Sequence, residues 1–134
     1  MNGARRPVRV MLMEQEEDLR HWLGRLLSRT EGYEYVGQCQ GAAELRAEAL
    51  RLRPDLLLLD SHSASALPAG FLAELRRQLP GLYVALMDIE EGPGYERLAR
   101  RAGADGFLSK ARVPEALAGL LDRLACGAPA SRTS

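Results

Sequence analysis

The chain is poor in aromatic residues, which make up 5% of its 134 residues, and it contains only two cysteines. Cys39 and Cys126 stand alone, with no Cys-x-x-Cys pair, so neither a zinc site nor a dithiol redox centre is indicated. We expect Cys39 to be a small buried residue and Cys126 to lie in a tail. Because hydrophobic residues still make up 46% of the chain, one core is expected, built from Leu, Ala and Val.

An excess of charge of either sign is also missing. Lys and Arg together number 18, as do Asp and Glu, so the formal net charge is zero. A neutral chain creates no long-range field toward nucleic acid or an anionic membrane, and we expect it to bind neither. The first residues lack the apolar run of a secretory signal, and no stretch approaches the roughly 20 apolar residues of a membrane span. A cytoplasmic protein is therefore expected.

Segments typical of strands alternate with segments typical of helices. The expected strands are 8–13, 33–39, 55–60, 82–87 and 104–109, and the expected helices are 16–28, 42–52, 71–79, 95–102 and 114–124. The third and fourth strands are unbroken apolar runs, which suit strands buried on both faces of a parallel sheet. Strict alternation predicts an α/β fold, a five-stranded parallel sheet with helices on both faces. We expect one domain over 8–126, with tails at 1–7 and 127–134, the latter a tail or the start of a linker.

The carboxyl ends of the predicted strands carry polar residues that could form one site. In parallel sheets ligands bind beyond these ends, where Glu14, Asp60, Asp88 and Lys110 lie. Clustered carboxylates bind Mg²⁺, a lysine supplies a point charge for a phosphoryl oxygen, and an aspartate can form an acyl phosphate. Each residue alone has a plainer explanation, since an Asp at a strand end is more often a helix cap. Their joint placement favours a phosphoryl-transfer site.

Three segments resemble receiver domains of bacterial response regulators. They are VRVMLMEQEEDLR at 8–20, PDLLLLD at 54–60 and AGADGFLSK at 102–110. The last is the strongest match, and the resemblance covers about residues 8–124. The chain is most similar to receivers that precede helix-turn-helix output domains. The resemblance implies a CheY-like, flavodoxin-like fold with strand order 2-1-3-4-5.

The resemblance also implies roles for individual residues. Asp60 would accept a phosphoryl group from a sensor histidine kinase, and Lys110 would contact that group. Glu14, Gln15, Asp60 and the backbone carbonyl of His62 would hold Mg²⁺. The domain would be no enzyme by itself.

Signalling in this family goes through a partner surface. Phe107 corresponds to the aromatic switch position of the family's fifth strand. The surface made by the fourth helix, fifth strand and fifth helix of the family corresponds to residues 95–124 here. The resemblance is compatible with a homodimer formed through this face.

Two charge-bearing positions of the family's pocket are among those that depart from the family pattern. Gln15 stands where the second acidic residue is expected, and it carries no charge. Asp88 stands where a Ser or Thr normally donates a hydrogen bond to the phosphoryl group, but an ionised carboxylate can only accept. One negative charge has in effect moved from position 15 to position 88. We therefore expect weak Mg²⁺ binding and a poor response to phosphoryl donors.

Two other functions remain open at this stage. A pseudo-receiver would act as a protein-interaction module without phosphorylation; Gln15 and Asp88 favour it, whereas Asp60 and Lys110 oppose it. A flavin or cobalamin binder could share the topology, but the acidic run that begins at Glu14 is hostile to a phosphate. The sequence does not decide between a phosphorylated receiver and a pseudo-receiver.

Overall fold

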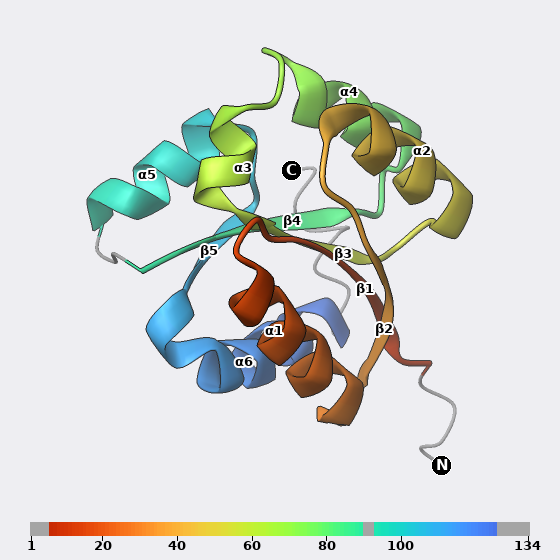
Figure 1. The fold of residues 1–134 in the computed structure, drawn as a ribbon, viewed down its shortest axis with the longest axis vertical. Coiled ribbons are helices and arrows are strands. Elements are labelled where there is room, and N and C mark those ends of the chain that lie inside the picture. The colour runs from red at the N-terminus through yellow and green to blue at the C-terminus, as the bar shows by residue number, and fades with distance from the viewer. Residues whose placement is uncertain (1–5, 90–92, 126–134) are drawn as a thin grey trace.

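Five parallel strands form one sheet, and helices cover both of its faces (Figure 1). The computed structural model describes residues 6–89 and 93–125. The strands are β1 (Val8–Met13), β2 (Tyr33–Gln38), β3 (Leu56–Asp60), β4 (Tyr83–Asp88) and β5 (Gly106–Ser109). Their order is β2-β1-β3-β4-β5, and every neighbouring pair is parallel. The predicted fold class and strand order are confirmed.

The leucine run in β3 explains why this strand lies at the centre of the sheet. Leu56, Leu57, Leu58 and Leu59 are all completely buried. Successive side chains of a strand point to opposite faces, so an unbroken apolar run requires a protein layer on each face.

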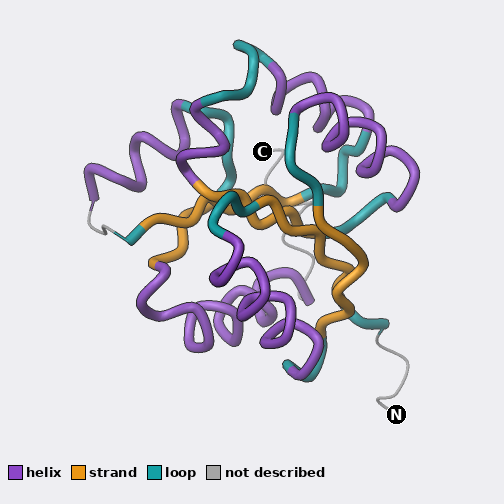
Figure 2. The backbone as a smooth tube through the Cα atoms, in the orientation of Figure 1, coloured by secondary structure: helices purple, strands orange, loops and turns teal. Residues whose placement is uncertain are grey.

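Two layers of helices supply that cover (Figures 1 and 2). The helices are α1 (Glu17–Arg29), α2 (Ala42–Leu52), α3 (Ser61–Ser65), α4 (Phe71–Gln78), α5 (Pro93–Arg101) and α6 (Val113–Ala125). Helices α1 and α6 lie on one face, where they pack on a cluster that contains Leu56 and Leu58. Helices α2, α4 and α5 lie on the other face, over a cluster that contains Leu57 and Leu59. The single core therefore has two halves, separated by the sheet.

Five helices were predicted over the segments that α1, α2, α4, α5 and α6 occupy, with ends that differ by at most two residues. The structure adds α3, in a segment for which neither a helix nor a strand was predicted, and a 3₁₀ turn over Lys110–Arg112. Five residues are too few to show a helical repeat of apolar positions, so α3 leaves no periodic pattern. Its position matters because α3 follows directly on Asp60.

The chain ends are described only in part. Arg6, expected in the N-terminal tail, donates two hydrogen bonds to the carboxylate of Asp55, at 3.1 and 3.2 Å. The rest of that tail up to residue 5, Cys126 and the predicted tail 127–134 lie outside the described residues. Cys39 is buried as expected, and burial raises the pKa of its thiol to about 12, with a smaller contribution from Glu44 and Glu48. No helix over 6–89 or 93–125 is long and apolar enough to cross a bilayer.

Candidate functional site

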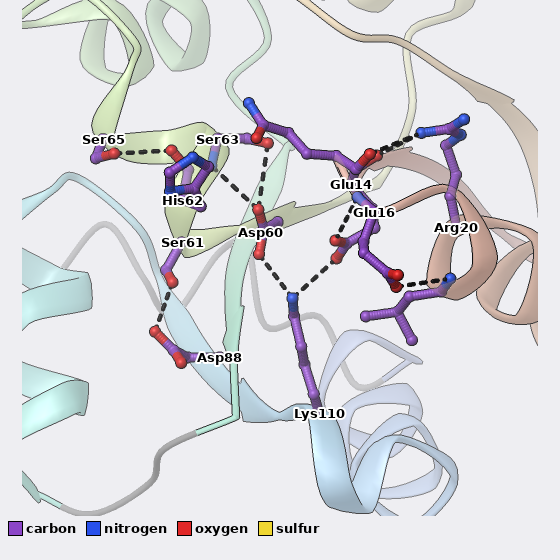
Figure 3. A network of polar contacts seen from close by, with 12 residues as sticks. Glu14, Glu16, Arg20, Asp60, Ser61, His62, Ser63, Ser65, Asp88 and Lys110 are labelled. Carbon is purple, nitrogen blue, oxygen red and sulfur yellow. Dashed lines mark hydrogen bonds and ion pairs between the residues drawn. The ribbon is translucent and has the colours of Figure 1, made fainter.

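Glu14, Asp60 and Lys110 meet at the carboxyl ends of β1, β3 and β5 (Figure 3). Lys110 Nζ lies 2.7 Å from Asp60 Oδ1 and 3.1 Å from Glu14 Oε1. Only 2% of Glu14 and 4% of Asp60 is exposed to solvent. Two buried carboxylates thus share one ammonium group, and the parallel sheet brings together three residues that are distant in sequence.

Asp60 uses both oxygens of its carboxylate. Oδ1 accepts the hydrogen bond from Lys110 Nζ, whereas Oδ2 accepts from the backbone N–H of Ser63 at 3.2 Å and from Ser63 Oγ at 3.4 Å. Asp60 is therefore the N-cap of α3, the plainer role that the sequence also allowed.

Lys110 is the only lysine of the chain, and all the other basic residues counted with it are arginines. Burial alone would lower its pKa and is the largest single effect. The hydrogen bond to Asp60 and the attraction of Glu14 together outweigh burial and raise the pKa of Lys110 above its usual value of 10.5. An ammonium group is a compact point charge, so Lys110 can stay charged between two carboxylates at neutral pH.

Glu14 lies in the loop between β1 and α1. Hydrogen bonds from neighbouring residues of the chain hold this loop in place. Its Oε2 accepts from the N–H of Glu16 at 3.1 Å, and Arg20 donates to the backbone carbonyls of Glu14 at 2.9 Å and Gln15 at 3.3 Å. Buried Glu14 Oε1 has no hydrogen-bond partner of acceptable geometry among the described residues, although Lys110 is near. Gln15 is exposed. The loop therefore presents one carboxylate oxygen that accepts no hydrogen bond, on Glu14, and one neutral amide, on Gln15.

The remaining predicted positions surround this cluster without joining it. Asp88 is turned toward Ser61, whose Oγ donates to its Oδ2 at 2.5 Å (Figure 3). The backbone carbonyl of His62 accepts from Ser65 Oγ at 2.7 Å. Phe107 is half-buried and stacks on Tyr95, with ring centroids 6.3 Å apart.

A ready-made metal site is not visible in the described part of the chain, where no three His, Cys, Asp or Glu residues are grouped to hold an ion. A hollow of about 270 Å³ lies beside Glu14 and has a mostly polar lining. Its lining residues are Met13, Glu14, Gln15, Cys39, Gln40 and Ser63.

No family model matches the chain, but curated proteins and solved structures do. Protein-glutamate methylesterase/protein-glutamine glutaminase 1 of Xanthomonas campestris pv. campestris is 32% identical over 108 residues, which are 80% of this chain and 30% of that protein. Response regulator GacA of Pseudomonas viridiflava is 29% identical over 104 residues, covering 77% of this chain and 48% of that protein. The chain thus spans less than half the length of these curated relatives.

The fold has close counterparts among solved structures. The signal receiver domain of the response regulator NarL from Mycobacterium tuberculosis superposes with a TM-score of 0.71 at 24% identity, covering 87% of this chain and 98% of that one. This chain has the fold of a response-regulator receiver domain, and its sequence is similar to that of response regulators. The predicted resemblance to receiver domains is confirmed. In this chain Lys110 contacts Asp60, while positions 15 and 88 carry Gln and Asp.

Proposed function

We propose that Asp60 accepts a phosphoryl group from a sensor histidine kinase and that the domain passes the signal on through a protein partner. The observation that supports this most strongly is the contact of 2.7 Å between Lys110 Nζ and Asp60 Oδ1. The only lysine of the chain lies beside the Asp60 carboxylate, whereas its other positively charged side chains of this class are arginines. A phosphoryl oxygen that replaced Oδ1 as the partner of Lys110 would form a charge-assisted hydrogen bond of the same kind.

The chemistry is nucleophilic substitution at phosphorus. A carboxylate oxygen of Asp60 would attack, a new P–O bond would give an acyl phosphate, and the P–N bond to the donor imidazole would break with its electron pair left on nitrogen. The donor takes up a proton, so charge and atoms balance. Lys110 would stabilise the charge on the phosphoryl oxygens, and Ser63 would continue to hold the other carboxylate oxygen.

Mg²⁺ is the metal that the fold implies, and the residues fit it only in part. Glu14 and Asp60 would hold it, with the amide oxygen of Gln15 as a neutral third ligand. Glu14 Oε1, which lies near Lys110 but accepts no hydrogen bond among the described residues, supports this fit, whereas the missing charge at Gln15 weakens it. The His62 carbonyl already accepts a hydrogen bond from Ser65, so it would have to bind the ion through its second lone pair. When bound, the ion would supply positive charge to the phosphoryl oxygens.

The wider expectations belong to the same proposal. Residues 8–126 would act as one receiver domain in the cytoplasm, without an enzymatic reaction of its own. The esterase and glutaminase names are those of relatives of which the chain covers 30%. The face around α5 and β5 exposes 72% of Ile89 and 57% of Leu98, which suits a protein partner or a second copy of the domain.

A phosphorylation-independent pseudo-receiver remains the second candidate, and two observations favour it. Asp60 is only 4% exposed, and Asp88 places a carboxylate where a receiver needs a hydroxyl donor. In that case the buried cluster of Glu14, Asp60 and Lys110 would serve stability alone.

Intact-mass measurement after incubation with acetyl phosphate and Mg²⁺ separates the two candidates. A single phosphoryl adduct that disappears in Asp60→Asn but persists in the matched surface variant Asp122→Asn would support phosphorylation. If the unmodified chain forms no adduct at any concentration of donor, or if the adduct persists in Asp60→Asn, the proposal is wrong.

A further inference from the structure

A second polar cleft lies between α1 and the edge strand β2, on a part of the domain that the phosphoacceptor chemistry does not use. Its volume is about 380 Å³. The lining residues are Arg20, His21, Gly24, Arg25, Ser28, Arg29, Tyr35 and Gln38. Six of them lie on α1, at spacings that place them on the same side of the helix.

The cleft concentrates positive charge in a chain whose net charge is zero. Arg20, Arg25 and Arg29 bring three guanidinium groups, and none of the described residues that line the cleft is acidic. Arg25 and Arg29 are exposed and have no ion-pair or hydrogen-bond partner in 6–89 or 93–125. Like charges at i and i+4 destabilise a helix, so this arrangement costs stability unless an anion sits between the two arginines.

Uncharged donors and a glycine complete the cleft. The Tyr35 hydroxyl and the Gln38 amide make no side-chain hydrogen bond within the described part of the chain. Burial raises the pKa of Tyr35, although Arg20 opposes the shift, so the hydroxyl keeps its proton and can donate. A Cβ atom at Gly24 would lie 3.1 Å from the Tyr35 ring, so glycine lets that ring lie close against α1.

We propose that this cleft binds a small oligophosphate anion. Guanidinium groups pair with phosphate oxygens through two parallel hydrogen bonds, and paired arginines with neutral donors beside them suit adjacent phosphates. The volume falls in the range of small-molecule sites, about 300–1,000 Å³. The chemistry fits an inorganic polyphosphate and the phosphate chain of a nucleotide equally well.

Arg20 connects this cleft to the loop that carries Glu14. Arg20 is one of the residues that line the cleft, and its guanidinium donates to the carbonyls of Glu14 and Gln15. An anion that draws Arg20 toward the cleft competes with these two bonds and loosens the loop that carries Glu14. Anion binding is therefore expected to shift the amide signals of this loop as well as those of α1 and β2.

The test is a ¹⁵N NMR titration of the full chain with tripolyphosphate, without metal and at constant ionic strength. We expect saturable shifts within 14–38 and a loss of affinity of about tenfold or more in Arg25→Gln/Arg29→Gln. Arg97→Gln/Arg100→Gln on α5 removes the same charge elsewhere and should bind as the unchanged chain does. Both pairs are exposed, and the spectra report whether each variant folds.

A second titration with ATP identifies the source of the phosphates. Tighter binding of ATP than of tripolyphosphate would indicate contacts to the nucleoside, and equal binding would indicate the phosphate chain alone; both agree with the proposal. Shifts that never saturate, shifts centred on Lys110, or an equal loss in the two double variants would overturn it.

Discussion

Ser61 Oγ donates a hydrogen bond to Asp88 Oδ2 across 2.5 Å and so ties the first residue of α3 to the last residue of β4. The carboxylate of Asp88 is thereby held beside the residue that follows Asp60 in the chain. An ionised carboxylate accepts hydrogen bonds and donates none. Position 88 therefore adds negative charge near Asp60, the proposed phosphoacceptor, and offers no donor to a phosphoryl group.

Replacing this carboxylate should speed phosphorylation. We expect Asp88→Thr to raise the rate of adduct formation with acetyl phosphate about tenfold, since removing about 1.4 kcal/mol of charge repulsion from a transition state has that effect. Rates are measured by intact mass at fixed Mg²⁺, with Asp122→Asn as a control for the loss of one surface charge. Equal rates in Asp88→Thr and the unchanged chain would show that position 88 does not limit the reaction.

A separate prediction concerns the metal. Gln15→Asp adds a third carboxylate beside Glu14 and Asp60, so Mg²⁺ affinity should rise by about tenfold, because carboxylates are the favoured ligands of this ion. Calorimetric titration with MgCl₂ measures the change. Gln78→Asp on α4 adds the same charge far from the pocket and should leave the affinity as it was. A similar gain in both variants would point to a general effect of charge.

The sequence was sufficient to predict the sheet and the convergence of Glu14, Asp60 and Lys110. An unbroken run such as Leu56–Leu59 has few stable solutions other than a strand covered on both faces, and parallel strands end at one edge. Because the sheet is parallel and its strands end at one edge, the residues at the carboxyl ends of the strands must lie along that edge. The confirmed strand order follows from the family resemblance rather than from these patterns.

The details around Asp60 could not be predicted in this way. Helix α3 has five residues, too few to show a periodic pattern. The hydrogen bond between Ser61 and Asp88 joins the start of α3 to the end of β4, and the sequence does not encode locally how these two segments are aligned. The N-cap carboxylate of Asp60 accepts from the backbone N–H of Ser63, which any residue except proline at that position could supply. The link from Arg20 to the carbonyls of the Glu14 loop was missed for the same reason.

The buried cluster should also contribute to stability. Lys110→Met would leave Glu14 and Asp60 as neighbouring buried carboxylates without a cation, and removing one partner of a buried pair costs about 3–5 kcal/mol of unfolding free energy. Lys110→Arg keeps the charge and should cost less, which makes it the matched control. Urea unfolding at pH 7 gives both values. Equal stability of Lys110→Met and the unchanged chain would mean that water reaches these carboxylates.

The single lysine allows the raised pKa of Lys110 to be measured directly. Reductive ¹³C-methylation labels the N-terminus and Lys110 alone, because the chain has no other lysine, and the α-amino group titrates well apart, near pH 8. The NMR midpoint of Lys110 in the folded domain should lie above that of the same label in urea, since Asp60 and Glu14 raise the pKa of this group. A pKa that is higher in the folded state contributes stability that is complete below the unfolded-state pKa, near 10.5, and is lost as the pH rises through the folded-state pKa. Asp60→Asn should lower the folded midpoint, and a folded midpoint equal to or below that in urea would contradict the ion pairs described here.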